Sequence, residues 1–337
     1  MAFYENDVLS SLRRENYSVP VLSSALQFTG RVQEELFLLA RESRRRYFCD
    51  NNVQVRSVIE ISNICRQGCR YCAIGNKTQE KDFALNAEQI LNLAEYLYNK
   101  GRKNILLQSG ENVNETFICE VERAIWEIKD RYPDIRIILC LGNLSYIQYK
   151  RLYDAGANDY ILKFETSNET LFSYCKPNDS LNNRLECIYS LNDIGYRVGS
   201  GNIVGLPGQS IDDLVADLIL AHKLPLAMNS TTIFIPAENT AFANESMGNL
   251  ETTLNMMALL RIMNPGRLMP TTSSLEKASH GGQFLGLMAG ANTVTIHDGT
   301  PEELQQYFPI YSSKRVRPQV EHLRDIVAQA GLCTENI

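Results

Sequence analysis

The chain lacks the features that mark several classes of protein. Its 33 Lys and Arg residues do not outnumber its 39 Asp and Glu residues, and it has no long basic block, which argues against nucleic acid or an anionic membrane as the main partner. No apolar stretch reaches the roughly 20 residues needed to span a bilayer, and the N-terminus lacks the basic and apolar regions of a signal peptide. Nine cysteines in 337 residues are too few for a disulfide-stapled secreted domain, so we expect a reduced, cytoplasmic protein.

The chain also lacks a Ser, Gly or Pro-rich linker, which favours one catalytic domain. Eight β-like runs are each followed by a helix-like stretch, and repeated strand-helix units predict a parallel sheet. A barrel of ordinary size accounts for about 250 residues, so we expect an α/β fold, a TIM-type (β/α)8 barrel. The expected strands are Val58–Ser62, Asn104–Gln108, Arg136–Leu141, Asp159–Phe164, Arg197–Val204, Met228–Ile235, Arg267–Thr271 and Asn292–His297.

Apolar residues recur at helical spacing between these runs. The clearest helices are expected at Ala87–Lys100, Thr116–Arg131, Leu181–Ile194, Ile211–Lys223 and Thr252–Met263. We divide the chain into a helical N-terminal extension (1–50), the barrel (51–312) and a C-terminal helix (313–337).

The most informative motif is a loop of three cysteines, Cys65, Cys69 and Cys72, directly after the first expected strand. Thiolates at the spacing C-x₃-C-x₂-C can reach three irons of one cubane cluster, whereas a complete all-thiolate [4Fe-4S] site needs a fourth cysteine. None follows within forty residues, so one iron would stay open. A structural zinc site is the alternative, but zinc sites prefer paired C-x₂-C knuckles or histidines, and the nearest histidine is His222.

Other polar and Gly-rich motifs follow successive strands, where barrel enzymes place their chemistry. The second strand is followed by Gly110 and Glu111, the fourth by Glu165-Thr-Ser-Asn168, the fifth by Gly205-Leu-Pro-Gly-Gln209 and the sixth by Ile235-Pro236. Each motif alone is weak evidence, because such residues often only form turns. Their position at the ends of successive strands predicts one site at the mouth of the barrel.

The cysteine loop, with Tyr71 before its third cysteine, resembles the signature of the radical S-adenosylmethionine (SAM) superfamily. Together with Leu107–Glu111, Phe164–Asn168, Asp179–Arg184, Gly199–Gln209 and Phe234–Pro236, the chain resembles the HydE family of [FeFe]-hydrogenase maturases from about residue 35 to about residue 312. The resemblance extends to the group that contains biotin synthase and methylornithine synthase. It implies an enzyme with a [4Fe-4S] cluster on the three cysteines, whose open iron is chelated by SAM.

The resemblance also implies a SAM site. Gly110 and Glu111 would bind the amino group, Glu165 and Arg184 the ribose and carboxylate ends, and Ile235 and Pro236 the adenine. Charge-assisted hydrogen bonds suit these residue types. The alternative for Glu165 and Arg184 is that each forms an ordinary ion pair. The remaining cofactor-binding residues that the resemblance implies are Tyr71, Gln108 and Ser167.

The expected substrate residues are Lys163, Thr271 and Thr272, with Tyr307 or Tyr311. Lys163 lies two residues before Glu165, on the same face of the strand. No acid is evident near it, so a substrate anion is expected as its partner, with a structural ion pair to a protein carboxylate as the alternative. Cys140 faces the lumen and is a candidate for substrate contact. His297, at the end of the eighth strand, is a further candidate, with a structural role as the alternative.

The sequence departs from the HydE pattern at Ala237–Thr240, Ser273–Glu276 and Thr295–Asp298, around the expected substrate. A second cluster of the biotin synthase type is not expected, because only Cys140 occupies one of its positions. The implied reaction is reductive cleavage of SAM to a 5'-deoxyadenosyl radical that acts on a small carboxylate-bearing substrate. An electron donor such as flavodoxin or ferredoxin is implied. Rearrangement as in methylornithine synthase, sulfur insertion as in biotin synthase, and a non-catalytic iron-sulfur scaffold remain open.

Overall fold

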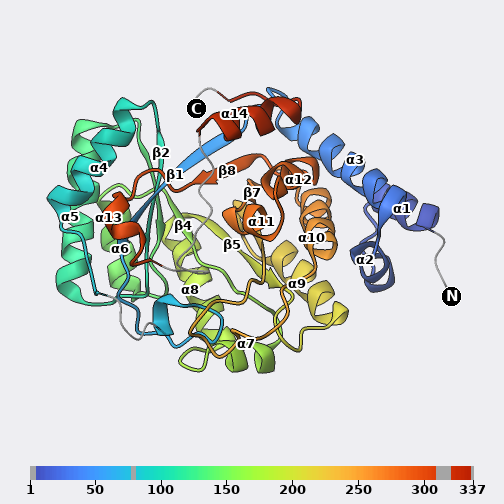
Figure 1. The fold of residues 1–337 in the computed structure, drawn as a ribbon, viewed down its shortest axis with the longest axis horizontal. Coiled ribbons are helices and arrows are strands. Elements are labelled where there is room, and N and C mark those ends of the chain that lie inside the picture. The colour runs from blue at the N-terminus through green and yellow to red at the C-terminus, as the bar shows by residue number, and fades with distance from the viewer. Residues whose placement is uncertain (1–4, 77–80, 309–319, 335–337) are drawn as a thin grey trace.

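Eight parallel strands form one sheet in the part of the chain that the computed structural model describes, residues 5–76, 81–308 and 320–334 (Figure 1). The order along the sheet is β6-β5-β4-β3-β2-β1-β8-β7, so strands that are consecutive in the chain are neighbours, except β6 and β7 at the two ends of the order. The strands are β1 (Gln54–Ser62), β2 (Asn104–Ser109), β3 (Arg136–Cys140), β4 (Asp159–Ile161), β5 (Arg197–Val204), β6 (Met228–Ile233), β7 (Pro270–Thr271) and β8 (Thr293–Ile296).

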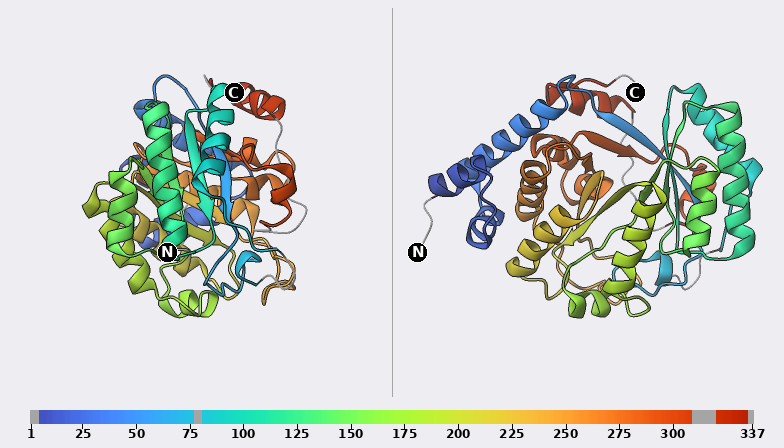
Figure 2. Two further views of the ribbon diagram at one scale, coloured as in Figure 1. Left: turned by 90° about the vertical axis from the view of Figure 1, so that its left-hand side faces the viewer. Right: turned by 180° about the vertical axis from the view of Figure 1, so that it is seen from behind.

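The sheet curls into a nearly closed ring, and its seam lies between β6 and β7 (Figure 2). One parallel bridge, Met228 to Leu268, joins the two sides, with Asn229 N–H donating to the Leu268 carbonyl at 2.9 Å. Pro270 has no N–H to extend this pairing. The fold is a TIM-type (β/α)8 barrel, which confirms the prediction.

Helices follow the strands and cover the outside of the ring (Figures 1 and 2). Several begin with residues that satisfy free backbone N–H groups: Asn86 with Gln89, Ser145 with Gln148, and Ser210 with Asp213 form capping boxes. The helices are α4 (Ala87–Asn99), α5 (Glu115–Arg131), α6 (Tyr146–Asp154), α7 (Glu169–Cys175), α8 (Leu181–Ile194), α9 (Ile211–Lys223), α10 (Leu250–Met263), α11 (Ser273–Ala278), α12 (Gly282–Met288) and α13 (Glu302–Gln305).

Three helices precede the barrel, α1 (Glu5–Arg13), α2 (Val19–Leu26) and α3 (Gly30–Tyr47), and α3 packs along α10 outside the ring (Figure 2). Buried Arg44 of α3 donates to the carbonyls of Leu287 and Ala291, both at 2.8 Å, at the end of α12. Helix α14 (Val320–Gln329) lies near the C-terminus. The three-part division of the chain remains a prediction, and its boundary at 312/313 lies outside the described residues.

Buried apolar side chains of the described residues form three clusters, and one of them, around Phe234 and Phe242, packs against Tyr71 of the cysteine loop. The large core lies between the sheet and the outer helices. A small separate cluster of Val58, Leu106 and Ile138 packs with Cys140 and Ile161 inside the ring. Because side chains alternate between the two faces of a strand with period two, every second residue of a strand shares the inner face with this cluster. No helix among the described residues is long and apolar enough to cross a membrane.

Candidate active site

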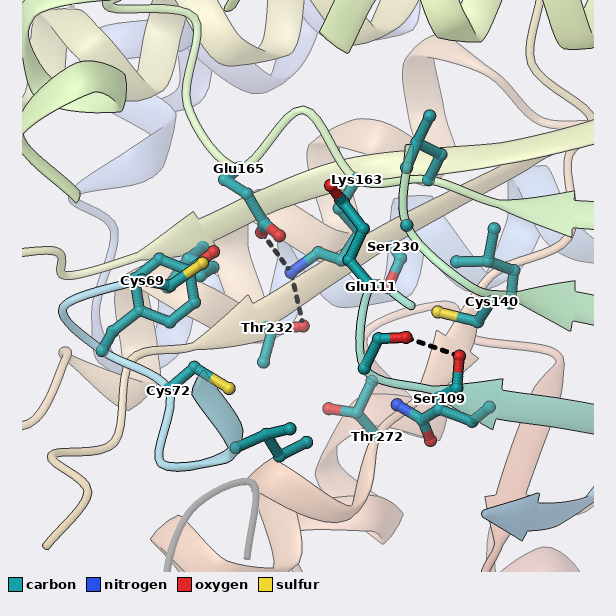
Figure 3. A pocket seen from close by; sticks show the side chains of 18 of the residues that line it. Cys69, Cys72, Ser109, Glu111, Cys140, Lys163, Glu165, Ser230, Thr232 and Thr272 are labelled. Atoms are coloured by element: carbon teal, nitrogen blue, oxygen red, sulfur yellow. Dashed lines mark hydrogen bonds and ion pairs between the residues drawn. The ribbon is translucent and has the colours of Figure 1, made fainter. Parts of the chain in front are cut away.

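A cavity of about 320 Å³ occupies the inside of the barrel and opens at the carboxyl ends of its strands. Figure 3 shows Cys69 and Cys72 on one side of it and Cys140 on the other, with Lys163 and Glu165 between them. The structure brings most of the predicted residues into this one lining: Cys65, Cys69, Tyr71, Cys72, Gln108, Gly110, Glu111, Cys140, Lys163, Glu165, Arg184, Ile235, Thr272 and His297. Ser167, Pro236, Thr271 and Tyr307 are not among the lining residues of the described chain.

The cysteine loop is shaped by its own hydrogen bonds. The amide of Asn76 donates to the carbonyls of Cys69 (2.7 Å) and Cys72 (2.9 Å). Burial raises the pKa of the Cys65 thiol, and burial together with Cys69 raises that of Cys72 to about 12. Among the described residues, no group of three His, Cys, Asp or Glu side chains is arranged to hold a single metal ion. A cubane cluster makes a different demand, because its three thiolates bind three separate irons.

Gly110 and Glu111 lie against the cysteine loop. A Cβ on Gly110 would lie 2.4 Å from the Ile64 carbonyl and 2.7 Å from Cys65 Cβ, so only glycine allows this approach. The backbone N–H of Glu111 donates to Cys65 Sγ at 3.3 Å. The buried Glu111 carboxylate accepts hydrogen bonds from Arg66 Nε and Gln67 Nε2, both at 2.8 Å. Its side chain therefore braces the loop, and its place as a SAM ligand remains a prediction.

Arg184, on α8, is buried at the edge of the cavity. Its Nη2 lies 2.8 Å from Asp179 Oδ2 and 3.9 Å from Glu111 Oε2. Burial and the Arg184 guanidinium act in opposite directions on Asp179, and the net effect lowers its pKa. Among the described residues these two carboxylates are the ones within ion-pair distance of Arg184, so Arg184 takes part in an ordinary ion pair, as the alternative expects.

Glu165 has an unusual backbone for a non-glycine residue, with φ of 64°. Such a conformation costs about 1–3 kcal/mol and persists only where its surroundings enforce it. Here β5 enforces it, because Glu165 N–H donates to the Gly201 carbonyl (3.0 Å) and its own carbonyl accepts from Ile203 (2.8 Å). The strained turn directs the Glu165 carboxylate into the cavity (Figure 3).

Lys163 corrects one expectation from the sequence. Its Nζ lies 3.0 Å from Glu165 Oε2 and donates to Thr232 Oγ1 at 3.1 Å (Figure 3). The prediction that no acid lies near Lys163 is therefore wrong. The sequence assigns Glu165 to SAM by resemblance, although Lys163 and Glu165 are two positions apart and share one face of the chain.

Ser167 supports the turn from behind the cavity. Its N–H and its hydroxyl both contact Asp217 Oδ1 at 2.6 Å, and Asn202 donates to Asp217 Oδ2 at 2.9 Å. Burial raises the Asp217 pKa to about 6, against the opposing effect of these donors. Asp217, on α9, thus connects the turn at Glu165 with β5, because it binds both Ser167 and Asn202. In the structure, Ser167 stabilises this turn.

Two charged residues of β1 that the sequence analysis did not single out lie on the inner face of the barrel. Arg56 of β1 lines the cavity and donates to Gln54 Oε1 at 2.9 Å and to Met228 Sδ at 2.6 Å. Glu60, also on β1, lies 3.2 Å from His297 Nδ1 through its Oε1. The side chains of Glu60 and His297 are 0% and 4% exposed. Period-two alternation from Val58 places Arg56 and Glu60 on the inner face, a signal that was present in the sequence.

The remaining substrate candidates separate into two groups. Burial raises the pKa of Cys140, which faces the cavity, to about 11. Thr272 also lines the cavity, with its hydroxyl 2.7 Å from Ser274 Oγ. Thr271 points elsewhere and donates to the Gln283 carbonyl at 3.0 Å. Tyr311 lies outside the described residues.

One further residue that the sequence did not suggest meets the cysteine loop. Lys176, at the end of α7, places its Nζ 3.1 Å from Cys69 Sγ. Three thiols around one cavity, with a buried cation on one sulfur, form a donor set that fits an iron-sulfur cluster and fits zinc poorly.

Comparison with known proteins agrees with this site. A family model of the radical SAM superfamily matches residues 59–221, which contain the cysteine loop, Glu111, Glu165 and Arg184. The chain belongs to the radical SAM superfamily. It is an enzyme, and the family implies a [4Fe-4S] cluster and SAM as its cofactors.

Three known proteins are similar to the chain over most of its length. The [FeFe] hydrogenase maturase subunit HydE of Thermotoga maritima is 36% identical over 311 residues, which are 91% of this chain and 88% of that protein. Biotin synthase of Photorhabdus laumondii is 28% identical over 268 residues, or 77% and 76% of the two chains. The crystal structure of methylornithine synthase (PylB) shares the fold, with a TM-score of 0.84, 22% identity and 97% coverage of both chains. These relatives confirm the predicted group.

Proposed function

We propose that the chain is a HydE-like radical SAM enzyme that cleaves SAM reductively and acts on a small carboxylate-bearing substrate. The observation that carries the proposal is that the three cysteines, the Gly110–Glu111 and Glu165 motifs and polar residues from several strands line one cavity. When bound, the cluster and SAM supply radical chemistry, in which one electron splits SAM into methionine and a 5'-deoxyadenosyl radical. A flavodoxin or ferredoxin is the proposed electron donor.

In the proposal, different residues of this chain hold the cluster and SAM, and the barrel wall encloses the substrate. Cys65, Cys69 and Cys72 would hold the cluster, and Gly110 would let the backbone approach the group bound at the open iron. Glu165, held by its strained turn, would meet the ribose of SAM. The barrel wall would exclude water and keep the substrate close to the reacting carbon.

Arg56, rather than Lys163, supports the proposal that the substrate carries a carboxylate. The charge of Lys163 is neutralised by Glu165 at 3.0 Å. For Arg56, no carboxylate of the described residues lies within ion-pair distance, and its side-chain partners are the Gln54 amide and the Met228 thioether. Burial lowers the Arg56 pKa to about 10, with Asp159 opposing the effect. A buried guanidinium without an anion is costly, so a substrate carboxylate would stabilise this end of the cavity.

The test compares acids with their methyl esters. Small amino acids and thioether carboxylates, each paired with its ester, are added to reduced holoenzyme with SAM, and 5'-deoxyadenosine is quantified. We expect the acid to stimulate cleavage and the ester not to. Loss of one charge-assisted hydrogen bond is worth about 1.5–3 kcal/mol, so Arg56→Met should reduce the preference for the acid about tenfold to a hundredfold.

Two variants complete the design. Arg56→Lys keeps the charge and should retain most of the preference. Lys163→Met leaves the Glu165 carboxylate without its cation, so we expect it to change the affinity for SAM more than the preference for the acid. Iron content and thermal unfolding monitor folding in each variant. Equal stimulation by acid and ester in the unmodified enzyme would contradict a carboxylate substrate.

A further inference from the structure

Lys176 is a buried cation at the cysteine loop that the proposed SAM and substrate sites do not use. It is the first residue after α7, is 5% exposed and lines the cavity. Its Nζ lies 3.1 Å from Cys69 Sγ. A lysine ammonium has three donors and no acceptor, so the sulfur is the acceptor in this contact.

The charge of Lys176 has no carboxylate partner among the described residues. No Asp or Glu of that part of the chain lies within ion-pair distance of its Nζ, and the Cys69 sulfur is its one side-chain hydrogen-bond partner there. Burying an ammonium without an anion is unfavourable. A thiolate at Cys69, as in an iron-bound cysteine, would supply the anion.

Backbone contacts fix the lysine against the cysteine loop. The Lys176 N–H donates to the Phe172 carbonyl at 2.8 Å, which ends α7. The Arg70 N–H, next to Cys69, donates to the Cys175 carbonyl at 2.9 Å, and Arg70 also stacks on Tyr174 with its guanidinium carbon 4.6 Å from the ring centre. The cysteine loop and the end of α7 are therefore hydrogen-bonded to each other through their backbones. These bonds fix the backbone positions from which Lys176 and Cys69 make their contact.

We propose that Lys176 is a positioning residue that raises the reduction potential of the cluster held by Cys65, Cys69 and Cys72. The inference rests on the proposed cluster site. Reduction of a [4Fe-4S] cluster from the 2+ to the 1+ state adds one electron, supplied by a low-potential one-electron donor, and no proton or bond change is required. A fixed positive charge and an N–H···S hydrogen bond both stabilise the added negative charge, and hydrogen bonds to cluster sulfurs are known to set such potentials. Because the site is buried, the effect is weakly screened.

The test is a dithionite redox titration of the anaerobic holoenzyme, with the EPR signal of the reduced cluster as the readout. Lys176→Met should lower the midpoint potential, and a tenfold decrease in the equilibrium constant for reduction corresponds to about 59 mV for one electron. Lys176→Arg keeps a cationic donor and should stay near the unmodified enzyme. Lys176→Gln keeps a donor without the charge and should lie between the two.

Arg70→Met is the matched control, because it removes a cation of the same loop that lies on Tyr174 rather than on sulfur. We expect a smaller shift for it than for Lys176→Met. If Lys176→Met fails to hold the cluster, Lys176→Gln still decides the question. Unchanged potentials in the Lys176 variants that load iron would overturn the role of Lys176. Absence of a SAM-responsive cluster signal in the unmodified enzyme would instead reject the cluster site itself.

Discussion

The cysteine-loop side of the cavity and the rest of its lining are built in different ways. Around the cysteine loop, residues from contiguous motifs bond to one another: Glu111 accepts from Arg66 and Gln67, and Arg184 pairs with Asp179. The rest of the lining consists of single side chains from separate strands and the turns after them, such as Arg56, Thr272 and His297. Two departures from the HydE pattern, Ser273–Glu276 and Thr295–Asp298, contribute to this second part of the lining. In the proposal, the cysteine-loop side holds the cofactors and the rest of the lining selects the substrate.

The largest expected effect would come from breaking the cysteine-loop side. Cys65→Ala, Cys69→Ala or Cys72→Ala should each reduce the iron content from about four per chain to near zero, because the three thiolates are the protein ligands of the cluster in the proposal. Cys140→Ala, across the cavity from the cysteine loop, is the matched control and should keep the iron. Iron analysis and the EPR change on adding SAM measure both. Retention of a SAM-responsive cluster in any one of the three loop variants would show that the cysteine-loop side is assigned incorrectly.

A smaller effect is expected behind the cavity, at Asp217. A carboxyl group whose folded pKa is raised from 3.8 to about 6 binds its proton more tightly in the folded state. The stabilisation of the folded state that results is fully present below about pH 4 and is lost as the pH rises through about 6. It amounts to about 3 kcal/mol in all, of which ~1.4 kcal/mol is lost between pH 5 and 7.5.

The measurement compares unfolding of the unmodified protein and Asp217→Asn at these two pH values. Since Asn cannot ionise, the variant should lack this part of the pH dependence, and the unmodified protein should lose ~1.4 kcal/mol more than the variant. Asp217→Asn should still be less stable at pH 5, because an amide cannot accept from both Ser167 and Asn202. Parallel stability profiles would mean that Asp217 stays ionised throughout.

The smallest effect concerns the chemical reactivity of the Cys140 thiol, across the cavity from the cysteine loop. Only the thiolate reacts readily with alkylating agents, and with a pKa of about 11 only about one Cys140 in three thousand is ionised at pH 7.5. Iodoacetamide should therefore modify the exposed cysteines Cys49, Cys119 and Cys333 of folded holoenzyme and leave Cys140 unmodified. Peptide mass spectrometry gives the extent at each site. Rapid modification of Cys140 would indicate that the part of the cavity around this thiol is open to solvent.

Much of the fold was predictable because its signals are local. Arg197–Val204, Leu181–Ile194 and Ile211–Lys223 have the bounds that were predicted from periodicity and caps. The β4 prediction was too long: the strand ends at Ile161, because the chain from Leu162 to Glu165 leaves regular pairing to form the strained turn. The β7 prediction began too early, since Arg267 instead donates to the Ala221 and Leu224 carbonyls at 2.6 and 2.9 Å.

The sequence by itself determined the superfamily, the barrel and the cysteine loop, because these depend on spacing along the chain: three thiols within eight residues, and strands that alternate with helices. Only the tertiary structure decided which charges neutralise each other. Glu60 meets His297 because β1 and β8 are neighbours, and Lys176 reaches Cys69 across more than a hundred residues. Electrostatic partners are set by distance and burial, and neither quantity is local in the sequence.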